Sequence, residues 1–172
     1  MGDSLTTIVA IFLAAVLMFV FPLAAMADRN DDSSQMYIQT TLDDFINKVS
    51  SKGSLTLQDY EQLEAQLEAT NNSYDIELTI NVADVNPGKK TDNKKIGDTT
   101  YYSEYTTQII AALKNSTTHT YYLKEGDYIK VSLKNINKTI SQMIKNALYG
   151  MTGNESYVIS AQASGVVVTT GY

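Results

Sequence analysis

The sequence predicts an α+β protein: a long N-terminal helix, transmembrane in its first half and amphipathic in its second, carrying a head of about four mostly antiparallel strands and short helices. An uninterrupted apolar run covers residues 5–27, and helical periodicity continues beyond it. Farther along the chain, segments with the two-residue period of strands alternate with helical ones, an order typical of α+β domains. Three segments are therefore predicted: an anchor (1–27), an amphipathic continuation of the helix (28–53) and an α+β head (54–172).

The apolar run extends from Leu5 to Ala27, and its only polar side chains are Thr6 and Thr7. About 23 residues at 1.5 Å each give a helix of roughly 34 Å, enough for a bilayer core of about 30 Å. We expect this helix to be retained and to anchor the protein in a lipid bilayer.

The same residues allow a second interpretation, a secretory signal peptide. Ala25-Met26-Ala27 has the small-x-small pattern of a cleavage site, and cleavage after Ala27 would release a secreted, adhesin-like binding domain. A signal peptide usually has an apolar region of about 7 to 15 residues that follows Lys or Arg. Here the run is longer and Met-Gly-Asp-Ser precedes it, which favours a retained anchor.

The helical pattern continues past the run. One apolar stripe is spaced i, i+4, i+7 and i+11, and residues 28–35 contain no Pro or Gly that would break the helix. The stripe consists of Ile38, Leu42, Phe45 and Val49. One helix from about Ser4 to about Ser50 is expected, ending at Lys52-Gly53. Pro22 removes one backbone hydrogen bond inside it, either as a harmless kink or as a hinge.

A capping pattern predicts the next helix, and alternation of apolar and polar residues predicts the strand after it. Residues 54–70 predict a short helix, in which Thr56 with Asp59 resembles a capping box. Its apolar side is formed by Leu57, Tyr60, Leu63 and Leu67. Residues 73–85 alternate between apolar and polar side chains and predict a half-buried strand. A basic loop is expected over residues 86–100.

The remaining elements are less regular. Residues 101–115 predict a helix with Tyr102, Tyr105, Ile109 and Leu113 along one side. Residues 119–137 predict two strands joined at Lys124-Glu125-Gly126-Asp127, where glycine supplies the turn. Residues 138–150 predict an amphipathic helix with Ile140, Ile144 and Leu148 inward, and residues 156–172 a closing strand.

Composition argues against several functions. Thirteen basic residues are scattered over a chain of net charge −6, whereas nucleic-acid binding needs a concentrated basic surface. There is no Cys, and His119, expected to face solvent, is the one histidine, so a histidine cluster or a Ser-His-Asp triad cannot form within one chain. Asp43-Asp44 splay apart, and Asp31-Asp32 lack the alternating oxygen ligands of a calcium loop. We predict a non-enzymatic protein without cofactor, metal or small-molecule substrate.

Small residues in the apolar run suggest self-association. Ala10 and Ala14 have the small-xxx-small spacing that lets membrane helices approach closely. The Thr- and Asn-rich surface predicted for the head suits the outside of the cell.

The architecture resembles the type IV pilin-like superfamily, in which an apolar helix runs into an amphipathic half and a small α+β head. More closely, "MGDSLTTIVAIFLAAVLMFVFPLAAMADRND", the Tyr-Asp-Ile-Glu-Leu strand and "LKEGDYIKVSLKN" resemble small membrane-anchored proteins of Gram-positive bacteria associated with tight-adherence-type pilus or conjugation-like secretion loci. The resemblance implies a pilin-like or pseudopilin subunit whose helix packs against copies of itself or other pilin-like subunits in a filament.

The chain departs from the pilin pattern at its start. The superfamily implies a basic leader ending in glycine and a mature helix with Glu at its fifth residue. In this sequence only Met1 precedes Gly2, and Thr7 is the fifth residue counted from Asp3. Asp3 could supply the acidic partner for a neighbour's N-terminal amine; alternatively, Asp3 and Ser4 cap the helix and complement its dipole.

Overall fold

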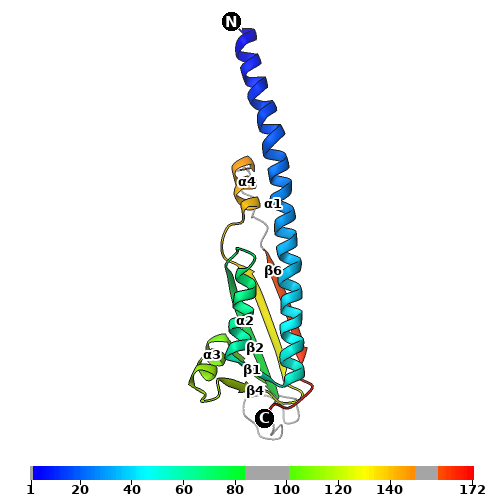
Figure 1. The fold of residues 1–172 in the computed structure, drawn as a ribbon, viewed down its shortest axis with the longest axis vertical. Coiled ribbons are helices and arrows are strands. Elements are labelled where there is room, and N and C mark those ends of the chain that lie inside the picture. The colour runs from blue at the N-terminus through cyan, green and yellow to red at the C-terminus, as the bar shows by residue number, and fades with distance from the viewer. Residues whose placement is uncertain (1, 84–100, 150–158) are drawn as a thin grey trace, which may run out of the picture. The chain divides into compact units, whose positions relative to one another are not determined.

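A computed structural model describes residues 2–83, 101–149 and 159–172. Its first element, α1 (Gly2–Lys52), is a single helix that continues through Pro22 and ends in the basic turn of Lys52 (Figure 1). The expected union of apolar and amphipathic segments in one helix is confirmed.

The chain forms two compact units, and α1 contributes to both. The first unit contains α1 up to Gln35 together with α4 (Ile140–Tyr149). The second contains α1 from Met36 onward, the other helices and all the described strands. We call this second unit the head.

The head is built on two antiparallel sheets, which confirms the predicted α+β class. The larger sheet has the order β3-β2-β5-β6, made of β2 (Tyr74–Ala83), β3 (Tyr101–Tyr105), β5 (Tyr128–Asn135) and β6 (Ser160–Val166). The smaller sheet pairs β1 (Ser54–Thr56) with β4 (Thr120–Tyr122). The helices α2 (Leu57–Glu68) and α3 (Thr106–Asn115) complete the head.

The core of the head contains the predicted stripe of α1. Ile38, Leu42 and Val49 are fully buried, and Phe45 is 6% exposed. The inward side chains of the strands are also buried, as their alternation predicts: Leu78, Ile80 and Val82 on β2, and Ile129, Val131 and Leu133 on β5.

Small residues on β6 allow α1 to lie close to this strand. Ala161 and Ala163 face inward, and a Cβ added to Gly165 would lie 2.8 Å from the Cγ2 of Ile46 on α1. The Ser50 carbonyl of α1 accepts a hydrogen bond from the Val168 amide at 3.2 Å. The end of the helix is therefore held by the last strand of the sheet and by the residue Val168 that follows it.

The segment Tyr101–Tyr105 was predicted to be helical, and this is wrong: it forms β3, and α3 begins only at Thr106. Its backbone pairs with β2 from Ala83↔Tyr101 to Thr79↔Tyr105. Tyrosine favours strands, and β2 offers an unpaired edge, so pairing with β2 overrides the helical spacing. Only Ile109 and Leu113 of the predicted apolar side lie in the helix and are buried.

The two strands in residues 119–137 exist but do not pair with each other. β4 pairs with β1, a strand that the sequence did not predict, whereas β5 lies between β2 and β6. The Asp127 carboxylate accepts hydrogen bonds from the Lys124 amide at 2.8 Å and from the Ala83 amide at 3.0 Å. These bonds make the turn a corner between two sheets instead of a hairpin.

The helix α4 exists, but Ile140 does not point inward as predicted, because its side chain is 61% exposed. Ser141 and Gln142 are the buried residues instead. Their polar groups have partners on α1 and on Thr139, which the periodicity of the sequence does not reveal. Leu148 lies where side chains are not described, and the predicted basic loop lies outside the described residues.

Candidate functional site

The apolar run is exposed over nearly its whole circumference. None of its most apolar window is buried within the structure, and Phe12, Met18 and Phe19 each expose about 70% of their surface. Among the described residues, α1 is the one helix long and apolar enough to cross a membrane, and a signal sequence would pass the same test. The run therefore needs an apolar environment that the described chain does not supply.

The four residues singled out from the sequence all lie in this part of α1. Ala10 and Ala14 are exposed one turn apart, and Pro22 is exposed inside the unbroken helix. Asp3 lies in the first turn of α1, and its side chain falls outside the described part of the chain. The structure thus leaves the small-xxx-small pair accessible to a neighbouring helix.

Polar contacts between α1 and α4 follow the apolar run, and we call them the joint. They are made by Asp28 and Asp31 of α1 with Thr139, Ser141 and Lys145. Asp28 forms an ion pair with Lys145 at 2.7 Å and accepts a hydrogen bond from the Ser141 hydroxyl. The bonds from Lys145 and from Ser141 hold the pKa of Asp28 below its ordinary value. Asp31, only 4% exposed, accepts a hydrogen bond of 2.6 Å from the hydroxyl of Thr139.

Thr139 also caps α4. Its hydroxyl accepts the Gln142 amide at 3.2 Å, and the Gln142 side chain accepts the Thr139 amide at 3.1 Å, which is a capping box. The spacing Thr-x-x-Gln was readable in the sequence, but the link to Asp31, 108 residues away, was not. Sequence reasoning therefore missed the joint.

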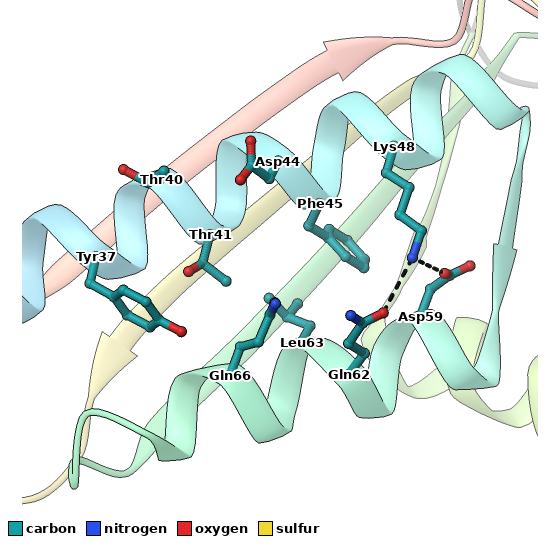
Figure 2. A pocket seen from close by; sticks show the side chains of 10 residues that line it. All are labelled: Tyr37, Thr40, Thr41, Asp44, Phe45, Lys48, Asp59, Gln62, Leu63 and Gln66. Atoms are coloured by element: carbon teal, nitrogen blue, oxygen red, sulfur yellow. Dashed lines mark hydrogen bonds and ion pairs between the residues drawn. The ribbon is translucent and has the colours of Figure 1, made fainter.

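In the head, a groove of about 330 Å³ lies between α1 and α2 (Figure 2). Its walls combine hydroxyl, amide and charged groups with two apolar side chains. The lining residues are Tyr37, Thr40, Thr41, Asp44, Phe45, Lys48, Asp59, Gln62, Leu63 and Gln66. Lys48 crosses the groove to contact Gln62 at 3.3 Å and Asp59 at 2.8 Å. The ammonium and the Asp59 carboxylate thus neutralise each other, which gives both a role in joining the helices.

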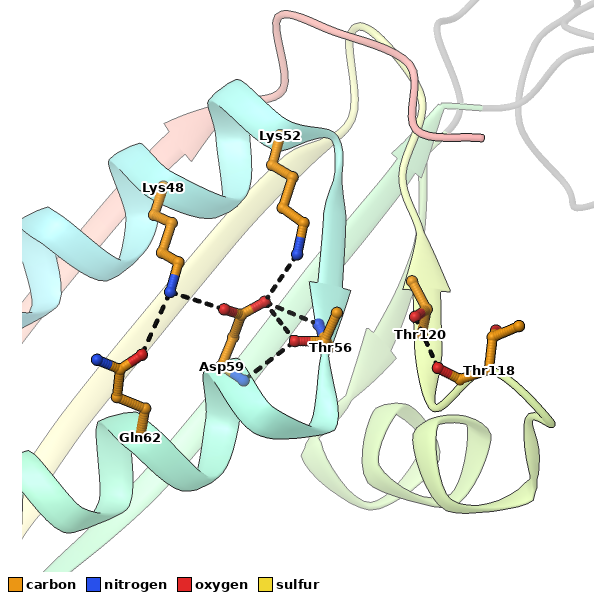
Figure 3. A network of polar contacts seen from close by, with 7 residues as sticks. All are labelled: Lys48, Lys52, Thr56, Asp59, Gln62, Thr118 and Thr120. Atoms are coloured by element: carbon orange, nitrogen blue, oxygen red, sulfur yellow. Dashed lines mark hydrogen bonds and ion pairs between the residues drawn. The ribbon is translucent and has the colours of Figure 1, made fainter.

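Asp59 is the centre of this network (Figure 3). Its carboxylate accepts the Thr56 hydroxyl at 2.6 Å and pairs with Lys52 at 3.4 Å. Burial alone would raise the pKa of Asp59, but the bonds from Lys48 and Thr56 outweigh burial and lower it to about 2. The Thr56 hydroxyl in turn accepts the Asp59 amide at 3.1 Å, which confirms the predicted capping box.

Acidic side chains and His119 do not form a metal site in the described ranges. No group of three or more His, Cys, Asp or Glu side chains there could hold a metal ion. His119 is exposed, as predicted, and Asp43 and Asp44 are both exposed on α1. The His119 carbonyl accepts the amide of Leu57, the first residue of α2, at 2.9 Å, a structural contact.

Comparison of the chain with models of protein families, with curated proteins and with solved structures gives no match.

Proposed function

We propose that this protein is a non-enzymatic, membrane-anchored subunit of a pilin-like or pseudopilin type, with its head outside the cell, and that it takes part in a bacterial surface filament or an envelope secretion assembly. One observation carries the proposal. The exposed apolar helix and the buried stripe of the head are parts of one uninterrupted helix, α1. Lipid and neighbouring apolar helices are the two environments that satisfy such a surface.

Retention of the run is the first requirement, and intact mass with N-terminal sequencing of the native protein tests it. We expect the mature chain to keep residues 3–27. A mature N-terminus at Asp28 would remove the anchor and replace the proposal by the secreted binding domain.

Exposed tyrosines support that second candidate, an extracellular adhesin-like domain. Tyr101, Tyr102 and Tyr105 on β3 are between 46% and 61% exposed. Tyrosine combines an apolar ring with a hydroxyl and is common at interaction surfaces. This function requires no self-association.

Self-association separates the two candidates when the run is retained. Ala10→Leu with Ala14→Leu keeps the run apolar, so insertion into membranes should be unchanged. The larger side chains should reduce crosslinking between copies severalfold, because they separate the helices. Phe12→Leu is the control, a change at an exposed position on the opposite side of the helix from the two alanines. If crosslinking gives only monomers in the wild type and in the variants, the result would favour a binding domain that does not self-associate.

A further inference from the structure

The first turn of α4 has the opposite polarity to that expected of a helix in water. Its polar residues Ser141 and Gln142 are buried, whereas Ile140 and Met143 are 61% and 52% exposed. A surface helix of a soluble domain normally turns its apolar side inward and its polar side to solvent. The exposed side of α4 therefore needs an apolar neighbour.

The polar side of α4 is fixed by the joint to α1. Thr139 bonds to Asp31, and Ser141 and Lys145 both contact Asp28. Because these three contacts hold one side of the helix against α1, rotation of α4 to bury Ile140 would break them. The outward position of the apolar side chains is thus built into the first unit.

The same contacts set the level of α4 along α1. Thr139 is beside Asp31 and Ser141 beside Asp28, so α4 runs antiparallel to α1, toward the apolar run (Figure 1). At 1.5 Å per residue, Met143 lies about 3 Å beyond Ser141 in that direction. It is therefore level with the last residues of the run, where the apolar surface of α1 ends at Asp28.

We propose that α4 is a second membrane contact, whose apolar side (Ile140 and Met143) enters the boundary between lipid headgroups and acyl chains beside the anchor. This inference rests on the proposed membrane anchoring of α1. The exposed apolar surface of α4 lies at the same level along α1 as the end of the apolar run. Lys145 pairs with Asp28 on the opposite, polar side of α4.

Spin labels test the proposal, because the chain has no cysteine of its own. Single-cysteine variants of the full chain carry the label at Leu13, Met143 or Asp43, each exposed in the structure. Each variant is placed at one copy per nanodisc of phosphatidylcholine and phosphatidylglycerol. Accessibility to oxygen, which enters lipid, is compared with accessibility to a water-soluble nickel chelate.

We expect the labels at Leu13 and Met143 to favour oxygen and the label at Asp43, about 22 Å farther along α1 than Asp28, to favour the chelate, with ratios severalfold apart. Ile140→Cys repeats the measurement at a second outward position, and circular dichroism checks that each labelled chain is folded. A label at Leu13 in lipid with the labels at Met143 and Ile140 in water would overturn the inference alone. A label at Leu13 in water would overturn the proposed anchoring itself. Shielding of Met143 only when several copies share a disc would assign this face to a second copy of the chain, which also overturns the inference.

Discussion

Gly53 shows how a single residue joins α1 to the head. Its backbone has φ of 65°, and a Cβ at this position would overlap the Thr169 carbonyl oxygen and lie 2.6 Å from the Gly171 amide nitrogen. Its carbonyl accepts the Leu123 amide at 2.8 Å. The end of α1, the corner before β5 and the C-terminal segment therefore meet at a residue that has to be glycine.

Gly53→Ala should destabilise the head by more than about 3 kcal/mol, because backbone overlap adds to the strain of the left-handed conformation. Gly126→Ala is the matched control, since its φ of 92° is strained but no atom lies within 4 Å of the added Cβ. We expect a loss of about 1 kcal/mol there. Thermal unfolding in mild detergent measures both, and equal losses would contradict the role of close packing at Gly53.

Asp59 contributes to the folding stability of the head, and this contribution depends on pH. Because its pKa is lowered from 3.8 to about 2 in the folded protein, folding favours the ionised carboxylate. The resulting stability is present above the pKa of the unfolded chain, about 3.9, and is lost as the pH falls toward 2. Asp59→Asn should therefore lower the free energy of unfolding at neutral pH by about 1–2 kcal/mol and flatten its acid dependence. Asp43→Asn, at an exposed position, is the control. An unchanged acid slope in Asp59→Asn would show that the network does not stabilise the charge.

At the scale of elements, local sequence patterns predicted the features that depend on residues close together in the sequence. The stripe of α1, the capping box of α2 and the alternation of β2 were all readable, because each is a regular spacing within one segment. The strand β3 was missed because its identity depends on the free edge of β2. The strand β1 was missed because three residues carry no period.

The candidate site was predicted in part for the same reason. The apolar run can be recognised from its composition, and the pair Ala10 and Ala14 from its spacing. The partner of Asp31 is Thr139, the residue that caps α4, 108 residues farther along the chain. No short-range pattern encodes such a contact, so the polarity of α4 could be interpreted only from the fold.

The two halves of α1 should respond differently to the same substitution. Leu42→Ala removes a fully buried side chain and should destabilise the head by about 2–4 kcal/mol. Leu17→Ala, at a position 56% exposed in the apolar run, should leave the unfolding of the head unchanged within about 0.5 kcal/mol. Unfolding in mild detergent, followed by tyrosine absorbance, reports on the head. A comparable loss in both variants would mean that the run contributes to the core.

At the scale of the whole molecule, the division into two units predicts independence of the head. The buried stripe of α1 and all the described strands belong to the second unit. Residues 28–172, expressed without the apolar run, should therefore fold as a soluble α+β domain. Circular dichroism should show helix and strand with a cooperative thermal transition. A spectrum of a disordered chain would show that the head requires the membrane half.

The contact between α1 and β6 has a consequence for biogenesis. The ribosome makes the stripe of α1 early, whereas Gly165 and Val168, which hold the end of that helix, are made among the last residues. At about 5–20 residues per second, translation of the intervening chain lasts on the order of 5–20 s. During this interval the stripe has no final partner, although the apolar run before it has already been synthesised. The head can therefore close only after β6 has been made, so insertion of the apolar run into a membrane, as we propose, would act on an open chain.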